Sequence, residues 1–181
     1  MSGQDGSTDG QVVRAILAGD TERYGELVTR YRDRYARYAS RMLGSADAAE
    51  DAVQDAFVRA YDQLAQCRDP DNFVGWFFLI LRNRCFAERR KSKEVAPLEA
   101  AGAIAAVERA EVPVEAAEQR RALQHALLEL TAEQREVFVL KHVEGLSYSE
   151  IAERLKTSVP SLKMRMHRAY DRLREQLRDR P

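Results

Sequence analysis

Apolar residues recur every three or four positions through most of this chain of 181 residues. Such spacing gathers them on one face of an α-helix, and it limits the possible fold more than any other feature of the sequence. The one short apolar run of the kind found in a buried strand is 137–140. It follows Thr131 and Gln134, whose reciprocal capping arrangement indicates a helix start. The sequence therefore predicts an all-α protein, with helices over 10–18, 21–43, 46–65, 72–91, 115–129 and 132–143 before the C-terminal region.

A segment of different composition divides these helices into two groups. Residues 92–114 are rich in alanine, include two prolines and a glycine, and contain no aromatic residue, as is common in linkers. We therefore expect one small helical domain at 1–91 and another at 115–181, joined by a flexible linker. The hydrophobic content of 45% is sufficient for a core in each.

The chain lacks the sequence marks of export, membrane insertion and metal binding. No run of about 18 apolar residues is present, and the N-terminal stretch is polar and acidic. The two cysteines, Cys67 and Cys85, lack CxxC spacing and have no histidine close by in the sequence. We expect a cytoplasmic protein with reduced thiols, no disulfide framework, no metal and no cofactor.

Residues 147–173 have the pattern of two amphipathic helices separated by a tight turn. Ser147 and Glu150 form a second reciprocal capping arrangement, and the apolar pattern breaks just before Ser158. Ser158 can cap the following helix, in which Pro160 is tolerated because the backbone donors of a first turn are unpaired anyway. This organisation predicts a helix-turn-helix, a motif whose second helix enters the major groove of DNA.

The second helix of this motif presents a mostly basic face opposite an apolar stripe. Between Arg154 and Arg178 there are eight lysines or arginines and two acids, a local charge of +6. The apolar stripe comprises Val159, Leu162, Met166, Ala169, Leu173 and Leu177. The residues that we predict to contact duplex DNA are Ser158, Ser161, Lys163, Met164, Arg165, Arg168 and Arg172. A solvated basic face on an ordinary bundle helix is the alternative.

Charge is strongly segregated along a chain that is formally neutral. Residues 43–73 carry seven acids and two arginines, residues 82–93 six bases and one acid, and residues 94–153 twelve acids and five bases. A protein that compacts DNA would be basic throughout, so this distribution favours two separate nucleic-acid contacts and a protein partner that tolerates acid. Fully extended, the linker spans at most about 75–83 Å, which is about two turns of duplex.

One face of the predicted helix at 46–65 holds a row of acids. Asp47, Asp51 and Asp55 follow one another at four-residue intervals, with Gln54 beside them. Like charges at this spacing repel by about 0.2–0.5 kcal/mol per pair, so the helix loses stability by keeping them together. A docking surface for a basic partner fits best. A solvated face and an acidic metal site are the alternatives.

The predicted helix at 72–91 changes from apolar to basic along its length. Its first half is apolar nearly all round, which indicates that most of its side chains are buried. Aromatic residues beside arginines and an asparagine are typical of single-stranded nucleic-acid sites, where stacking contributes about 1–3 kcal/mol per base. The candidates are Trp76, Arg82, Asn83, Arg84, Arg89 and Arg90. An ordinary basic helix end is the alternative.

Taken together, these motifs resemble the bacterial RNA polymerase sigma factors of the extracytoplasmic-function (ECF) type, in the sigma-70 family. DAAEDAVQDAFVRAY at 47–61 and FVGWFFLILRNRCFAERRK at 73–91 are similar to sigma region 2. The helix-turn-helix and the helix before it, residues 130–173, are similar to sigma region 4. The motifs occur in the order that the family has, separated by the expected linker.

The resemblance implies a transcription initiation factor without catalytic activity, which binds core RNA polymerase and directs it to specific promoters. The minus-10 element would be recognised as a melted strand, with Asn83 at the base-reading position, by Trp76, Arg82, Asn83, Arg84, Arg89 and Arg90. The helix-turn-helix would read the minus-35 element as duplex and contact the β flap. The surface for the coiled-coil clamp of the β′ subunit would comprise Asp47, Asp51, Gln54 and Asp55. The resemblance also implies an anti-sigma factor as partner, and the bacterial cytoplasm as location, at the nucleoid when active.

The chain departs from the family pattern at four positions. An acid is usual where Ala87 stands, a small residue in the turn where Lys156 stands, glycine where Pro160 stands, and a small polar residue where Met164 stands. These positions lie where bases are contacted, so we carry over no promoter sequence.

Two other functions make different predictions. A free-standing helix-turn-helix regulator would bind operator duplex without polymerase and would not need residues 1–91. A metal-dependent enzyme would bind a divalent ion, and replacing Asp51 and Asp55 by Asn would abolish that binding.

Overall fold

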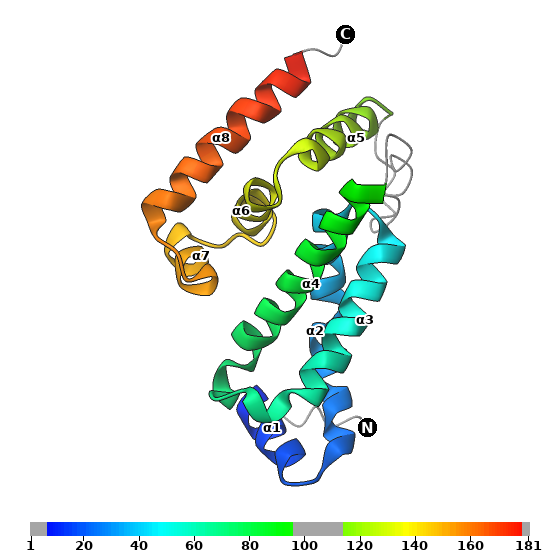
Figure 1. Cartoon of the computed structure of the whole chain (residues 1–181), viewed down its shortest axis with the longest axis vertical. Coiled ribbons are helices and arrows are strands. Elements are labelled where there is room, and N and C mark those ends of the chain that lie inside the picture. The colour runs from blue at the N-terminus through cyan, green and yellow to red at the C-terminus, as the bar shows by residue number, and fades with distance from the viewer. Residues whose placement is uncertain (1–6, 96–113, 179–181) are drawn as a thin grey trace.

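The structure is a computed structural model that describes residues 7–95 and 114–178, with side chains described for 7–92 and 122–178. The described residues form helices and no strand, which confirms the predicted all-α class. The helices are α1 (Asp9–Leu17), α2 (Tyr24–Leu43), α3 (Ala46–Asp62), α4 (Phe73–Val95), α5 (Val114–Glu129), α6 (Ala132–His142), α7 (Tyr148–Leu155) and α8 (Val159–Arg178) (Figure 1). Short 3-10 turns lie at Thr21–Arg23, Leu64–Gln66 and Pro70–Asn72.

The N-terminal domain is a bundle of α2, α3 and α4, with α1 packed across one end (Figure 1). Phe77 of α4 lies at its centre, fully buried, with its ring centroid 4.4 Å from that of Phe57 and 4.9 Å from that of Tyr35. One face of α3 is apolar and buried throughout: Ala49, Ala52, Val53, Ala56, Phe57 and Ala60. Alanines on this face bring the backbone of α3 close to its neighbours.

The helix starts follow from their capping residues. Thr131 and Gln134 bond reciprocally at the start of α6, and Ser147 and Glu150 do the same at the start of α7. At the start of α8, the Ser161 backbone N–H donates to the Ser158 hydroxyl, with an N–O distance of 3.3 Å. Each of these caps pairs backbone donors that have no partner within the helix.

The chain between the two domains differs in one respect from the prediction. We expected the linker to begin at residue 92, whereas α4 continues to Val95. Its Ser92 hydroxyl donates to the carbonyl of Glu88 one turn earlier, at 3.2 Å, and no helix-breaking residue occurs before Pro97. The rest of the predicted linker, except Val114, lies outside the described residues.

The C-terminal domain is formed by α5 to α8. Leu162, Met166, Ala169 and Leu173 of α8 are buried, as their spacing predicts. Leu177, the last residue of the predicted apolar stripe of α8, is 43% exposed. It lies in the last turn of α8, so the predicted stripe is longer than the buried one.

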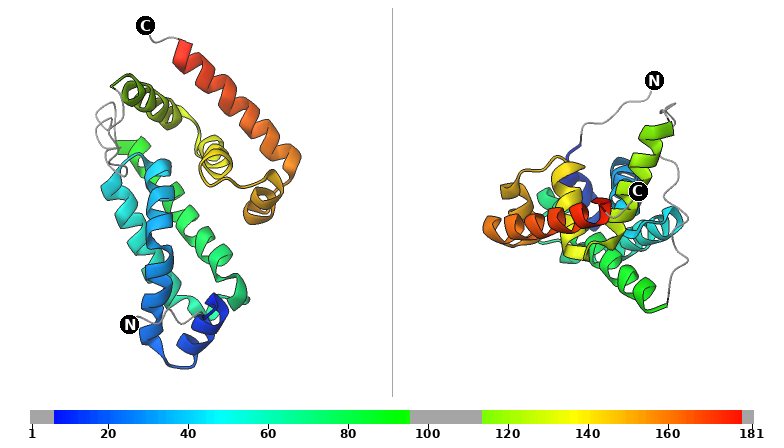
Figure 2. Two further views of the ribbon diagram at one scale, coloured as in Figure 1. Left: turned by 180° about the vertical axis from the view of Figure 1, so that it is seen from behind. Right: turned by 90° about the horizontal axis from the view of Figure 1, so that it is seen from above.

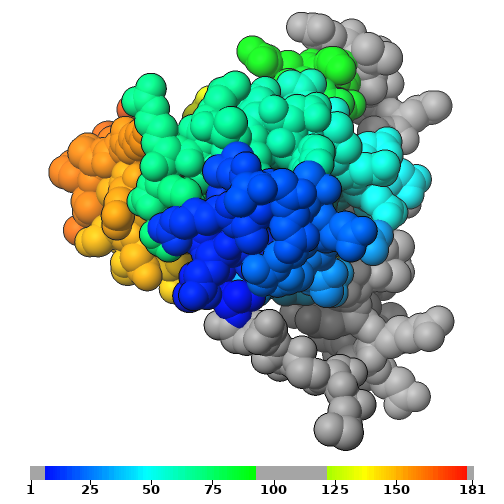
Figure 3. All heavy atoms as spheres, turned by 90° about the horizontal axis from the view of Figure 1, so that it is seen from below, coloured from blue at the N-terminus to red at the C-terminus, as the bar shows by residue number. Residues whose placement is uncertain are grey.

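The two domains pack against each other. Helix α6 lies between α8 and the N-terminal bundle in two opposite views (Figures 1 and 2). A single apolar cluster extends from Phe77 and Phe78 of α4 to Leu140 of α6 and Met166 of α8. Seen from below, α7 and the start of α8 lie beside the first turns of α4, while α1 and the start of α2 cover the end of the bundle (Figure 3). We call this contact between the domains the seam.

Within the described ranges 7–95 and 114–178, none of the helices combines the length and the apolar character needed to cross a bilayer.

Candidate nucleic-acid interface

The predicted duplex-binding face of α8 is open to solvent. Met164 is 57% exposed, and Lys163, Arg168 and Arg172 are exposed as well. Ser158 is also exposed, whereas Ser161 and Arg165 are half-buried at its edges. The face forms because these residues lie on the side of α8 opposite Leu162, Met166, Ala169 and Leu173.

The turn that positions α8 carries a conformational cost. Lys156 ends α7 in the left-handed region, with φ of 50° and ψ of 50°. Glycine is the usual residue there, because a Cβ atom in that conformation approaches the following carbonyl. Lys156 therefore occupies a strained backbone conformation in this turn.

The predicted strand-binding residues of α4 are only partly available. Asn83 and Arg90 are exposed, and Trp76 is half-buried with its ring 6.0 Å from that of Phe73. The guanidinium of Arg84 pairs with Asp55 of α3, with an Nε–O distance of 2.7 Å. Asn83 and Arg90 are therefore the accessible members of the predicted set; Arg84 is engaged within the N-terminal domain, and two further arginines of the set contact the C-terminal domain.

The first of these is Arg82, which forms an ion pair with a carboxylate of the C-terminal domain. Its Nε donates to one oxygen of Glu136 on α6 at 2.6 Å, and its Nη2 donates to the other at 3.0 Å. The Tyr38 hydroxyl of α2 donates to the same carboxylate at 3.3 Å. The Glu136 side chain is 0% exposed, so this is a buried, bidentate ion pair between the two domains.

The environment of this pair shifts both pKa values. Burial raises the pKa of the Glu136 carboxyl, although Arg82, Tyr38 and the charge of Arg165 each act to lower it. Burial alone would lower the pKa of Arg82, but its hydrogen bond to Glu136 and the charge of that carboxylate raise it instead. Each group thus depends on the other for its charge to be tolerated away from water.

The second inward arginine is Arg89, which is buried at 8% exposure. Its Nη2 donates to the carbonyl of Leu128, at 3.2 Å, and to that of Leu130, near the end of α5. Arg135 of α6 completes this contact: its Nε donates to Leu127 at 2.6 Å, and its Nη1 crosses the seam to the Met42 carbonyl at 2.5 Å. Burial, with the charge of Arg89 nearby, lowers the pKa of Arg135 to about 9.

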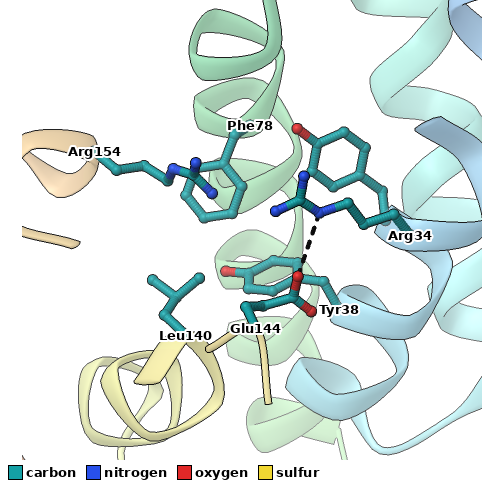
Figure 4. Close-up of a pocket in the computed structure, with 7 residues that line it drawn as sticks. Arg34, Tyr38, Phe78, Leu140, Glu144 and Arg154 are labelled. Carbon is teal, nitrogen blue, oxygen red and sulfur yellow. Dashed lines mark hydrogen bonds and ion pairs between the residues drawn. The ribbon is translucent and has the colours of Figure 1, made fainter. Parts of the chain in front are cut away.

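A shallow hollow at the edge of the seam holds a second cross-domain ion pair (Figure 4). The Arg34 Nε of α2 lies 3.3 Å from a carboxylate oxygen of Glu144, which follows α6. On the other side of the hollow, the guanidinium of Arg154 on α7 lies 5.4 Å from the ring centroid of Phe78. Both domains therefore supply charge to this edge.

The acidic row lies on α3, on the side of the bundle away from α6 to α8 (Figure 1). Asp47, Asp51 and Gln54 are exposed, whereas Asp55 pairs with Arg59 at 2.9 Å as well as with Arg84. Two large apolar side chains are exposed on the same helix, Val58 at 55% and Tyr61 at 41%. The row is therefore part of a mixed acidic and apolar surface, suited to a basic amphipathic partner.

The predicted alternative of an acidic metal site has no geometric support here. Among the residues that the structure describes, no group of three or more His, Cys, Asp or Glu side chains is arranged to hold a metal ion.

Glu136 and Arg135 were not among the site residues predicted from the sequence. A signal was present: these two charged residues directly precede the apolar run 137–140, on a helix expected to be buried. Buried charges are rare unless paired, so their position could have predicted a cross-domain contact. Their partners could not be identified, because Arg82 and Met42 are distant in the sequence.

Comparison with known proteins gives matches over both domains. Residues 27–95 match the family model for Sigma-70 region 2, and residues 120–173 match the model for Sigma-70, region 4. The ECF RNA polymerase sigma factor SigW of Bacillus subtilis is 33% identical over 178 residues, which cover 92% of this chain and 95% of that protein. The ECF RNA polymerase sigma-E factor of Escherichia coli strain K12 is 30% identical over 175 residues, 91% of each chain.

Solved structures are similar over the same extent. CnrH in complex with the cytosolic domain of CnrY has a TM-score of 0.67 and 28% identity, covering 97% of this chain and 100% of that chain. The sigma factor RpoE in complex with the anti-sigma factor NepR from Bartonella quintana has a TM-score of 0.64 and 26% identity, covering 87% of this chain and 98% of that chain.

Proposed function

Because the chain belongs to the ECF sigma factors of the sigma-70 family, a group of promoter-directing transcription initiation factors, we propose how its surfaces divide that work. The face of α8 binds minus-35 duplex, the basic end of α4 binds the melted minus-10 strand, and α3 docks on core RNA polymerase. The chain contributes no catalytic step of its own.

The observation that carries the proposal is the separation of three surfaces. Exposed cations lie on α8, an exposed asparagine and arginine lie on α4, and exposed acids lie on the far side of α3. Cations suit phosphates, and acids would repel them. The acidic surface is therefore the one that can bind a protein while both basic surfaces bind DNA.

The duplex-binding set comprises Ser158, Ser161, Lys163, Met164, Arg165, Arg168 and Arg172. In a helix-turn-helix the N-terminal residues of the second helix face base edges. The methyl group of Met164 is placed to meet a thymine methyl, and the arginines to bind guanine or phosphate.

The strand-binding set comprises Trp76, Arg82, Asn83, Arg84, Arg89 and Arg90. Asn83 reads a base that has left the stack, and the cations hold the backbone. Extrusion of a base costs a few kcal/mol, about the amount that one or two stacking contacts return.

The polymerase-docking set comprises Asp47, Asp51, Gln54 and Asp55, with the β′ clamp coiled coil as its partner. The β flap is the partner of the C-terminal domain. An anti-sigma factor is a further partner, which is supported by the similarity to RpoE bound to NepR.

The test is reconstitution with core RNA polymerase and a library of genomic promoter fragments. The wild-type chain should form a complex with core and select a subset of promoters for transcription. An inability to bind core would contradict the proposal, and binding to duplex without core would favour a free-standing regulator.

A matched pair of variants tests the docking surface. Asp51→Arg places a cation against a basic partner and should weaken core binding at least about tenfold, because like charges across an interface are strongly unfavourable. Asp33→Arg changes an exposed acid of α2 outside the row and should bind core like wild type. Equal affinities for the two variants would show that α3 is not the docking surface.

A further inference from the structure

The Glu136 carboxylate is the most enclosed charged group in the seam. It is 0% exposed, and groups from both domains converge on it: Arg82 and Tyr38 by hydrogen bonds, and Arg165 by its charge. Arg82 belongs to the strand-binding set and Arg165 to the duplex-binding set. The carboxylate therefore lies within electrostatic reach of a cation from each of the two proposed DNA surfaces.

A carboxylate offers Arg82 the same geometry as a phosphate group. A guanidinium binds either anion through two parallel N–H···O bonds, and here Nε and Nη2 are both used on Glu136. The guanidinium carbon of Arg82 also lies 4.4 Å from the ring centroid of Phe86, so this ring covers one face of the group. The two nitrogens that Arg82 uses on Glu136 cannot bind a phosphate group of DNA until Glu136 is released.

Arg89 is withdrawn from DNA by the same packing. Its Nη2 is held by carbonyls at the end of α5, and only 8% of the residue is exposed. Two of the six strand-binding candidates are therefore occupied by the C-terminal domain, while the face of α8 stays open.

We propose that Glu136 is an intramolecular latch: it holds the two domains closed on each other and keeps Arg82 and Arg89 from the minus-10 strand until the seam opens. This inference rests on the proposed function, because it takes α4 to be the strand-binding helix. Binding to polymerase opens the latch by placing the domains on separate subunits, and in return an open chain binds polymerase more tightly.

The latch predicts a measurable penalty on strand binding by the free chain. When only a fraction of molecules is open, the apparent Kd equals the intrinsic Kd divided by that fraction. A closed population of about nine-tenths therefore weakens strand binding about tenfold.

The Arg34–Glu144 pair offers a way to open the seam without touching either DNA surface. Glu144→Arg sets like charges against each other across the seam, at a position 3.3 Å from Arg34 in wild type and beside the hollow that Arg154 also lines. The exchanged double variant Arg34→Glu with Glu144→Arg restores an ion pair. Glu136→Gln provides the direct test of the latch itself.

The experiment measures the binding of a fluorescein-labelled, mixed-sequence single-stranded 20-mer by anisotropy, and the radius of gyration by small-angle X-ray scattering. Both Glu144→Arg and Glu136→Gln should enlarge the free chain and tighten strand binding about tenfold. The exchanged double variant should return both quantities to wild-type values. Saturating promoter-directed transcription with core should be the same for wild type and Glu144→Arg, since polymerase already separates the domains.

Two results would overturn the latch. An enlarged Glu144→Arg variant with unchanged strand affinity would show that the closed seam does not hinder binding, and an unchanged size would show that these contacts do not hold the domains together. In either case wild type could still direct transcription with core, which leaves the proposed function intact. Failure of wild type to do so would contradict the proposed function instead.

Discussion

The two helices proposed to bind DNA, α8 and α4, treat their arginines in opposite ways. On α8 the basic residues lie opposite a single buried apolar stripe, so Arg168 and Arg172 point to solvent. Helix α4 contacts α2 and α3 and also meets the C-terminal domain across the seam, so Arg82 is half-buried in an ion pair and Arg89 is buried. A basic residue is thus available only where one side of its helix has no neighbour.

The same difference determines how much the arginines of each helix contribute to stability. The exposed cations of α8 contribute little, since exposed ion pairs such as Arg172–Glu175, at 3.7 Å, are worth about 0–1 kcal/mol. The Arg82–Glu136 pair is buried, and removal of one partner from such a pair typically costs about 3–5 kcal/mol. Substitutions on α8 should therefore change DNA binding alone, whereas those at the inner face of α4 change both.

The enclosure of α4 can be tested through Cys85, which lies on the same helix. Burial, with the charge of Glu136, raises the pKa of its thiol to about 12 from an ordinary value of 9.0. The thiolate fraction at pH 8 should then fall by roughly three orders of magnitude, and the rate with a disulfide reagent such as DTNB should fall with it. Rapid reaction of Cys85 in the native protein, with the urea-unfolded chain as control, would show that α4 is not enclosed.

The central position of α4 predicts a large loss of stability for Phe77→Ala. The ring is fully buried among Phe57, Tyr35 and Phe73, so its removal should lower the free energy of unfolding by about 3–5 kcal/mol. Urea denaturation followed by far-UV circular dichroism measures this. Val58→Ala, at an exposed position, is the matched control and should change stability by less than about 0.5 kcal/mol. Similar losses for both would contradict the packing described.

Most of the helical pattern was predictable from the sequence, because it depends on local periodicity and capping. The buried residues of α8 and the caps at Thr131 and Ser147 all occur where the sequence places them. The end of α4 was misplaced by four residues, because nothing local stops the helix before Pro97. Helix ends are less strongly encoded than helix faces.

The candidate site was predictable only in part. The exposure of the α8 cations follows from the amphipathic pattern of that helix. Whether Arg82 is available to a ligand depends instead on its ion pair with Glu136, which lies 54 residues further along the chain. Pairing over such a distance is set by how the domains pack, which periodicity does not report. The sequence therefore predicts a set of candidate DNA-binding residues, and the structure shows which of them are engaged in contacts within the protein.

The open face of α8 predicts a selective effect for Arg168→Ala. If the guanidinium contacts a base, affinity for the cognate minus-35 duplex should fall by about 1–3 kcal/mol, while stability stays near wild type. If it contacts phosphate, the slope of log K against log salt should fall by about 0.9. Arg89→Ala is the contrasting variant, because its carbonyl contacts predict a loss of stability. An unchanged affinity and salt slope for Arg168→Ala would show that this face does not contact DNA.

The smallest expected effect concerns the turn before α8. Lys156→Gly removes the Cβ atom from a residue at φ of 50°, so it should stabilise the C-terminal domain by up to about 1 kcal/mol. The greater freedom of glycine in the unfolded chain offsets part of the gain. The difference in thermal unfolding midpoint between Lys156→Gly and wild type measures this gain in stability. Marked destabilisation would mean that Lys156 makes a contact that offsets its strain.

The closed seam is tested most directly by a distance between the domains, with and without polymerase. Donor and acceptor dyes on cysteines introduced at Thr29 of α2 and Glu175 of α8, both exposed, report that distance while Cys67 and Cys85 stay buried. We predict high energy transfer in the free chain and a marked decrease when core RNA polymerase binds. Transfer that is equally low before and after core is added would contradict a closed free state.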